Sequence, residues 1–114
     1  MTKVVFDSSA ILAIMRKEAG YKNALPFLNQ AIVSTVNLTE IVSRLHSWQI
    51  SSTDIEIMIE KLSVDIYNHD KALAFKSGKL VSQTAAYGLS LGDRACLALA
   101  QWLEASVITA DKIW

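Results

Sequence analysis

Four acidic side chains occupy positions at which an α/β protein could gather them into one site. We call them the acidic quartet: Asp7, Glu40, Asp93 and Asp111. Asp7 and Asp111 follow short runs of β-branched residues, whereas Glu40 and Asp93 lie near the predicted starts of helices. In an open parallel sheet, sites form at the carboxyl ends of the strands, where the following helices also begin. We therefore expect the quartet to face one crevice.

Four clustered carboxylates repel one another, and this repulsion would raise the pKa of one or two of them. A divalent cation removes the repulsion. Mg²⁺ and Mn²⁺ prefer hard oxygen ligands and are typically held by one or two carboxylates together with waters and substrate phosphate. Because such an ion activates water and stabilises charge on a phosphoryl oxygen, the quartet indicates metal-assisted hydrolysis of a phosphodiester.

The two acidic residues near helix starts also have structural interpretations. Asp93 fits a capping box with Ser90, and Glu40 fits one with Asn37 as the cap. Glu40 could instead pair with Arg44, one helical turn later. The two residues at strand ends have alternatives of the same kind, since Asp7 could cap the next helix and Asp111 could be a turn residue. A shared location at one sheet edge favours a site.

Hydrophobic periodicity predicts the elements that must position the quartet. Short β-branched runs predict four strands, at residues 3–6, 31–34, 64–67 and 106–109. Helical spacing predicts helices over 8–18, 36–48, 51–62 and 94–104, with a loop over 88–92. A longer helix, capped by Asn68 or Asp70, is predicted to run to residue 87. Pro26 kinks or divides a further helix over 21–29. Short strands separated by helices indicate an α/β fold around a mostly parallel sheet.

Length and composition limit the class of protein. With 114 residues, we expect a single domain spanning 1–114. Hydrophobic residues make up 52% of the chain, which argues against disorder, and the net charge of zero argues against electrostatic coating of nucleic acid. The single cysteine, Cys96, excludes an internal disulfide and a cysteine-rich zinc site. Without a leader or a membrane-length apolar run, we expect a soluble, cytoplasmic protein that does not contact membranes.

Four segments of the chain resemble the PIN-domain nucleases, and most closely the VapC-type toxins of bacterial toxin–antitoxin pairs. They are VVFDSSA at 4–10, NLTEI at 37–41, LGDRACLALA at 91–100 and VITADKIW at 107–114. The resemblance covers essentially the whole chain and implies a three-layer PIN-like α/β fold. Family members usually continue beyond the position of Trp114 into another strand, so we expect the last edge strand to be missing or a partner to complete the edge.

The resemblance also implies roles for individual residues. The acidic quartet would hold Mg²⁺ or Mn²⁺, Thr109 would support the metal-bound water, and Ser9 would steady Asp7. The implied activity is an endoribonuclease that cuts structured RNA such as tRNA. The implied partners are a cognate VapB-like antitoxin and a second copy of the chain in a homodimer.

The evidence for a functional role is weaker for two basic residues, two histidines and the cysteine than for the quartet. Arg94 and Lys112 adjoin quartet members and could contact RNA phosphates, or could be solvated surface charges. His46 and His69 have no second histidine or cysteine at ligand spacing, and Cys96 is typical of a helix core.

Two regions carry more apolar residues than the core-facing side of a helix requires. Such residues indicate either core packing or a groove for an amphipathic partner helix. One candidate region contains Trp48, Ile50 and Ile57, and a second contains Tyr21, Phe27 and Leu28.

Two other functions remain open from the sequence. One is a non-catalytic PIN-like module for protein association. The other is a phosphatase with Asp7 as its nucleophile, a scheme that requires a second aspartate where this chain has Ser9.

Overall fold

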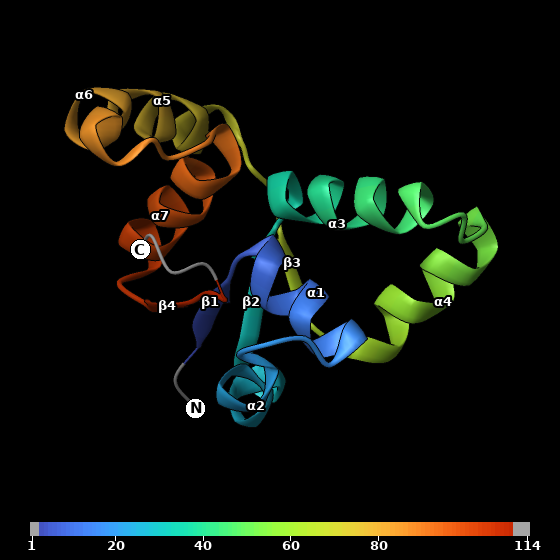
Figure 1. The fold of residues 1–114 in the computed structure, drawn as a ribbon. Coiled ribbons are helices and arrows are strands. Elements are labelled where there is room, and N and C mark those ends of the chain that lie inside the picture. The colour runs from blue at the N-terminus through green and yellow to red at the C-terminus, as the bar shows by residue number, and fades with distance from the viewer. Residues whose placement is uncertain (1–2, 111–114) are drawn as a thin grey trace.

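The protein is built around a parallel sheet, seen in a computed structural model that describes residues 3–110 (Figure 1). Within these residues the sheet has four strands in the order β3-β2-β1-β4, and all of its pairings are parallel. The strands are β1 (Val4–Phe6), β2 (Ala31–Ser34), β3 (Asp65–Tyr67) and β4 (Ser106–Ile108). Each agrees with its predicted position to within one residue at either end, and the predicted parallel α/β sheet is confirmed.

Helices connect the strands and cover both faces of the sheet (Figure 1). They are α1 (Ser8–Arg16), α2 (Tyr21–Ala24), α3 (Thr35–Ser47), α4 (Ser52–Leu62), α5 (Lys71–Lys79), α6 (Val81–Thr84) and α7 (Leu91–Leu103), with 3-10 turns η1 (Leu25–Gln30) and η2 (Ala85–Tyr87). None of the helices within residues 3–110 combines the length and apolar character needed to cross a membrane.

Strand β1 links the two halves of the core because alternate residues of a strand point to opposite faces. Val4 and Phe6 pack with α1, α3 and α4, whereas Val5 packs with α5 and α7. All three side chains are buried, as expected of a parallel strand covered on both faces. The result is a three-layer fold in which α1, α3 and α7 all approach the carboxyl end of β1.

Several helix boundaries differ from the predicted ones. The predicted single helix over 68–87 is wrong: it breaks after α5 into α6 and η2. At the break, the backbone N–H of Leu80 donates to the Ser77 carbonyl, three residues back, at 3.2 Å, a 3-10 bond in place of the α-helical one. The helix predicted over 21–29 divides into α2 and η1, with Pro26 in the first turn of η1.

The two predicted apolar regions are only partly exposed. Trp48 and Ile50 pack against the core, whereas Ile57 on α4 is 45% exposed. In the second region Leu28 packs against the core and Phe27 is 40% exposed. Between α3 and α4 lies an open pocket of about 410 Å³ with an apolar lining that includes Leu38, Val42, Ile55 and Ile59.

Candidate active site

Asp7 lies directly after β1 and caps the start of α1. Its Oδ1 accepts hydrogen bonds from the backbone N–H of Ala10 at 2.9 Å and from the hydroxyl of Ser9 at 2.8 Å. Its Oδ2 accepts one from the hydroxyl of Thr109, which follows β4. The capping interpretation of Asp7 is therefore confirmed, and the same contacts fix the direction of the carboxylate.

Burial makes the Asp7 carboxylate unfavourable without a counter-charge. The residue is only 3% exposed, and burial raises the pKa of its carboxyl above the ordinary value of 3.8. Hydrogen bonds from Thr109, Ala10 and Ser9 act against this rise, and the negative charge of Asp93 adds to it. A cation bound beside Asp7 would relieve both the burial penalty and the repulsion.

The carboxyl ends of β1 and β4 are joined beside Asp7. The Asp7 backbone N–H donates to the Ile108 carbonyl at 3.2 Å, and the Ala110 N–H donates to Ser9 Oγ at 3.0 Å. These bonds bring residues 109 and 110 to the site. Asp111 and Lys112 follow immediately in the sequence but lie outside the described residues.

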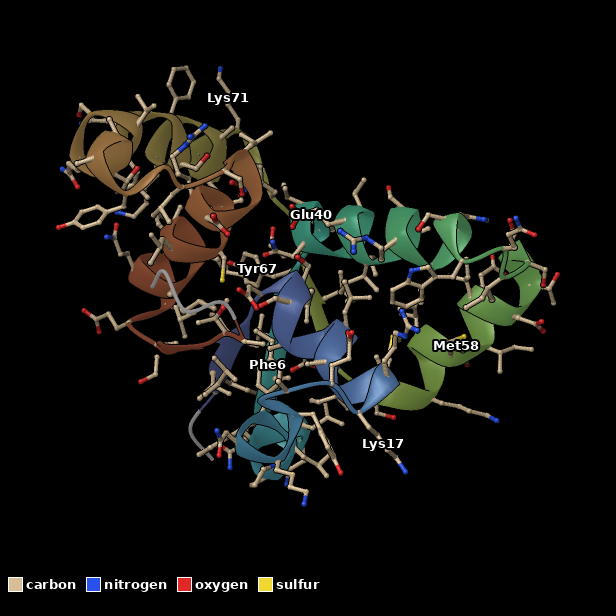
Figure 2. All side chains as sticks on the ribbon, viewed as in Figure 1. Phe6, Lys17, Glu40, Met58, Tyr67 and Lys71 are labelled. Atoms are coloured by element: carbon tan, nitrogen blue, oxygen red, sulfur yellow. The ribbon has the colours of Figure 1, made fainter. Side chains whose placement is uncertain are left out.

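Glu40 lies in the second turn of α3, in the half of this helix nearer to α7 (Figure 2). Its Oε1 accepts hydrogen bonds from Asn37 Nδ2 at 2.8 Å and from the Ser8 hydroxyl at 3.0 Å. The proposed capping box with Asn37 as the cap is wrong, because α3 begins at Thr35 and its cap is Ser34. The alternative pairing with Arg44 is also wrong, since the ion pair found among residues 3–110 joins Lys3 to Asp65.

Gly92 is where α3 and α7 meet, one residue before Asp93. A Cβ atom on Gly92 would lie within 2.5 Å of the Glu40 carboxyl carbon, so the Glu40 carboxylate occupies the space that a side chain would fill. Asn37 Nδ2 also donates to the Gly92 carbonyl at 3.2 Å. Sequence reasoning missed Gly92 and gave Asn37 a different role. The available signal was a glycine directly before an acidic residue, inside the predicted Ser90–Asp93 capping box.

Asp93 forms the predicted capping box at the start of α7. Asp93 Oδ2 accepts from the Ser90 N–H at 2.9 Å, and the Asp93 N–H donates to Ser90 Oγ at 3.1 Å. The predicted loop over 88–92 is thus too long, because α7 starts at Leu91. Asp93 is half-buried.

Cys96 lies on α7, one turn beyond Asp93. Its thiol is fully buried, and burial raises the pKa of Cys96 far above its ordinary value. The negative charges of Asp7, Asp93 and Glu40 all raise this pKa further. Cys96 is thus a core residue, as expected.

The oxygen atoms of Asp7, Glu40, Asp93 and Asn37 suit a hard divalent cation, but they do not form a complete set of metal ligands. Within residues 3–110, no group of three His, Cys, Asp or Glu side chains is placed to hold a metal ion together. Mg²⁺ needs only one or two carboxylates, because waters complete its coordination. The Oδ1 atom of Asn37 is buried without a hydrogen-bond partner in the described part of the chain, and it adds an oxygen that a bound water could satisfy.

Arg94 follows Asp93 but is partly tied to the protein. It is half-buried, and its Nη1 donates to the Leu89 carbonyl at 3.2 Å. Its Nε is buried without a partner among the described residues.

His46 is exposed on α3, and the backbone N–H of His69 donates to the Thr35 hydroxyl at 3.0 Å. Neither histidine bonds to a carboxylate of the site in the region described.

Solved structures and a family model agree with this fold, whereas a comparison with curated proteins finds no match. Among solved structures, the chain is similar to a toxin–antitoxin complex from Klebsiella pneumoniae, with a TM-score of 0.73 and 22% identity over 96% of this chain and 87% of that one. It is also similar to DNA-bound VapBC from Salmonella typhimurium, with a TM-score of 0.63 and 15% identity over 96% and 85% of the two chains. The PIN domain family model matches residues 4–114, and the chain therefore belongs to the PIN domain family.

Proposed function

We propose that the protein is a Mg²⁺- or Mn²⁺-dependent endoribonuclease that acts as the toxin of a VapBC-type toxin–antitoxin pair. The observation that carries the proposal is that Glu40 lies against Gly92, the residue before Asp93, and accepts a hydrogen bond from Ser8, the residue after Asp7. Membership of the PIN family supports it, because PIN domains are generally nucleases. The fold shared with chains of toxin–antitoxin complexes supports the toxin role.

Each carboxylate has a defined part in this proposal. A bound Mg²⁺ or Mn²⁺ supplies activation of water and stabilisation of charge on the phosphate. Asp7, Glu40 and Asp93 hold the ion, and Asp111 is proposed as the fourth carboxylate. Ala10, Ser9 and Thr109 hold Asp7 in place, and Asn37 and Ser8 hold Glu40. Such fixed ligands keep the geometry of the site without reorganisation during the reaction.

The neutral and basic groups have supporting parts. Thr109, whose hydroxyl already contacts Asp7, orients the attacking water. Arg94 and Lys112 contact the RNA backbone and reduce its repulsion by the acidic site. The substrate is structured RNA such as tRNA, and the protein partners are a VapB-like antitoxin and a second copy of the chain.

An RNA cleavage assay tests the proposal directly. We expect Asp7→Asn and Asp93→Asn each to lower the Mg²⁺-dependent cleavage rate by about 10²–10³-fold, the range for loss of one electrostatic stabiliser. Both asparagines can still accept the capping hydrogen bonds, so the fold should survive. Asp54→Asn is the matched control, because Asp54 is exposed in the first turn of α4. Unchanged cleavage by Asp93→Asn would exclude the nuclease site proposed here.

Expression in a bacterial host separates a toxin from a housekeeping nuclease. We expect expression of the wild-type chain to arrest growth, and Asp7→Asn or Asp93→Asn to relieve the arrest. A non-catalytic binding module would show neither divalent-cation binding nor RNA cleavage. Growth arrest that persists in both variants would contradict the toxin mechanism.

A further inference from the structure

A second pocket is lined mainly by α1 and lies beside the two serines that bond Glu40 and Asp7. It has a volume of about 430 Å³, within the range of small-ligand sites. Its lining includes Ser8 and Ser9 at the start of α1, Leu12 and Ala13 further along α1, and Arg44 on α3. Trp48, which follows α3, closes part of its wall.

The inner wall of this pocket is shared with the candidate active site. Ser8 donates to Glu40 Oε1 at 3.0 Å, and Ser9 donates to Asp7 Oδ1 at 2.8 Å. The two serines that line the pocket are therefore the residues that hold two of the carboxylates. A ligand in the pocket would lie next to a phosphate bound at the acidic site.

Arg44 gives the pocket a positive charge that is not paired with a carboxylate within residues 3–110. It lies on the same face of α3 as Glu40, one turn or about 6 Å further along the helix. Its side chain is exposed, so it is available to a ligand. Arg16 lies close to one wall residue, because its guanidinium is 4.2 Å from the centre of the Trp48 ring.

The remaining lining indicates where a charged and an apolar part of a ligand would bind. Leu12, Ala13 and Trp48 form an apolar wall suited to a base or ribose. Glu18 also lines the pocket and is exposed. Because its negative charge would repel a phosphate, the phosphate belongs on the Arg44 side.

We infer that this pocket binds one nucleotide of a single-stranded RNA segment next to the cleaved bond, with Arg44 contacting its phosphate. The inference rests on the proposed ribonuclease function and adds a substrate-binding residue to it. An acidic metal site repels the RNA backbone, so binding requires cations on the neighbouring phosphates. Arg44 is placed to supply one such contact a single helical turn from Glu40.

Binding of a fluorescein-labelled single-stranded RNA octamer tests this inference. Fluorescence anisotropy measures the Kd in EDTA over a series of salt concentrations, and gel electrophoresis confirms that the RNA stays intact. We expect Arg44→Ala to weaken binding about tenfold, as for loss of one charge-assisted hydrogen bond. The slope of log Kd against log salt should fall by about 0.7, the value for one phosphate contact in a single strand.

Three variants control this experiment. Lys79→Ala removes an exposed positive charge from α5, which packs against the opposite face of the sheet, and it should bind like the wild type. Arg44→Lys should keep most of the affinity because it keeps the charge. Glu18→Gln should bind more tightly, since it removes the repulsive charge. Arg44→Ala should fold normally, because Arg44 is exposed and alanine favours helix.

The outcomes separate this inference from the function on which it rests. The inference would be overturned if the wild-type protein binds and cleaves RNA and Arg44→Ala binds it with the same Kd and the same salt slope. That result would leave the proposed ribonuclease function intact. Failure of the wild type to cleave RNA in the presence of Mg²⁺ or Mn²⁺ would overturn the proposed function itself.

Discussion

The two sides of the acidic site are held together by different means. On one side, hydrogen bonds engage both oxygens of Asp7, from α1 and from the residue after β4. On the other side, Glu40 accepts hydrogen bonds through Oε1 and lies against Gly92, where a side chain is missing. Asp7 is thus fixed mainly by polar contacts, and Glu40 also depends on the close approach of two helices.

This difference teaches which substitutions each side can tolerate. Asparagine can replace Asp7 and still accept the capping hydrogen bonds, so the local structure should remain while the charge disappears. Gly92 has no such replacement, because even a methyl group would overlap the Glu40 carboxylate. We therefore expect the Glu40 side to be sensitive to shape and the Asp7 side to be sensitive to charge.

Gly92→Ala should have the largest effect of the changes that keep every charge. The added Cβ would displace the Glu40 carboxylate or separate α3 from α7. We expect a loss of about 1–3 kcal/mol in the free energy of unfolding, as for overpacking. A misplacement of about 1 Å near reacting groups can cost 10²-fold in rate, and RNA cleavage should fall by about that factor.

The matched control for Gly92→Ala is Gly78→Ala on α5. A Cβ atom on Gly78 would meet nothing within 4 Å, and alanine favours helix over glycine by about 0.8–1.0 kcal/mol in a helix interior. Urea denaturation should show Gly78→Ala to be at least as stable as the wild type. Equal stabilities for Gly92→Ala and Gly78→Ala would show that close helix contact is not what places Glu40.

Asn37→Ala should have the next largest effect. Asn37 is 1% exposed, and its Nδ2 bonds both Glu40 and the Gly92 carbonyl. Loss of these bonds should cost about 1–3 kcal/mol, because buried acceptors would remain unsatisfied. Urea denaturation measures this cost, with the exposed Asn68→Ala as the control. An Asn37→Ala variant as stable as the wild type would contradict the role assigned to this amide.

The smallest expected effect is a pH-dependent change in stability caused by Asp7→Asn. Because the pKa of Asp7 is raised in the folded state, folding favours its protonated form. Stability of the metal-free protein should therefore fall as pH rises from 3.8 through the raised pKa. The amide introduced by this substitution carries no charge at any pH, so the Tm of Asp7→Asn in EDTA should exceed that of the wild type at neutral pH.

Thermal unfolding at several pH values measures this effect. The difference in Tm between the two proteins should shrink as the pH falls below 3.8, where Asp7 is protonated in both states. A wild-type Tm that rises with pH relative to the variant would show that hydrogen bonds outweigh burial at Asp7.

Local sequence patterns predicted the sheet and the positions of most helices. Strands such as Ala31–Ser34 were predictable because β-branched residues stand between clear helix signals. Asp7 was predictable for the same reason, since its place depends only on the strand before it and the helix after it. The same holds for Asp93, whose capping box with Ser90 spans three residues.

Contacts between distant segments could not be read from local patterns. The hydrogen bond from Asn37 to Gly92 joins residues 55 positions apart and depends on how α3 packs against α7. The break after α5 was also missed, because the sequence carries no glycine or proline at Leu80, where the backbone hydrogen bond shortens to the 3-10 pattern. The role of Asn37 was misread because Ser34, at the end of β2, already caps α3.

Direct measurement of Mn²⁺ binding tests the central claim that distant carboxylates share one cation site. Isothermal titration calorimetry with metal-free protein would compare the wild type with Asp7→Asn, Glu40→Gln and Asp93→Asn. We expect the wild type to bind Mn²⁺ and each variant to bind it about tenfold or more weakly, while Asp54→Asn binds like the wild type. Wild-type protein that binds no Mn²⁺, or variants that all bind it with unchanged affinity, would contradict the shared site.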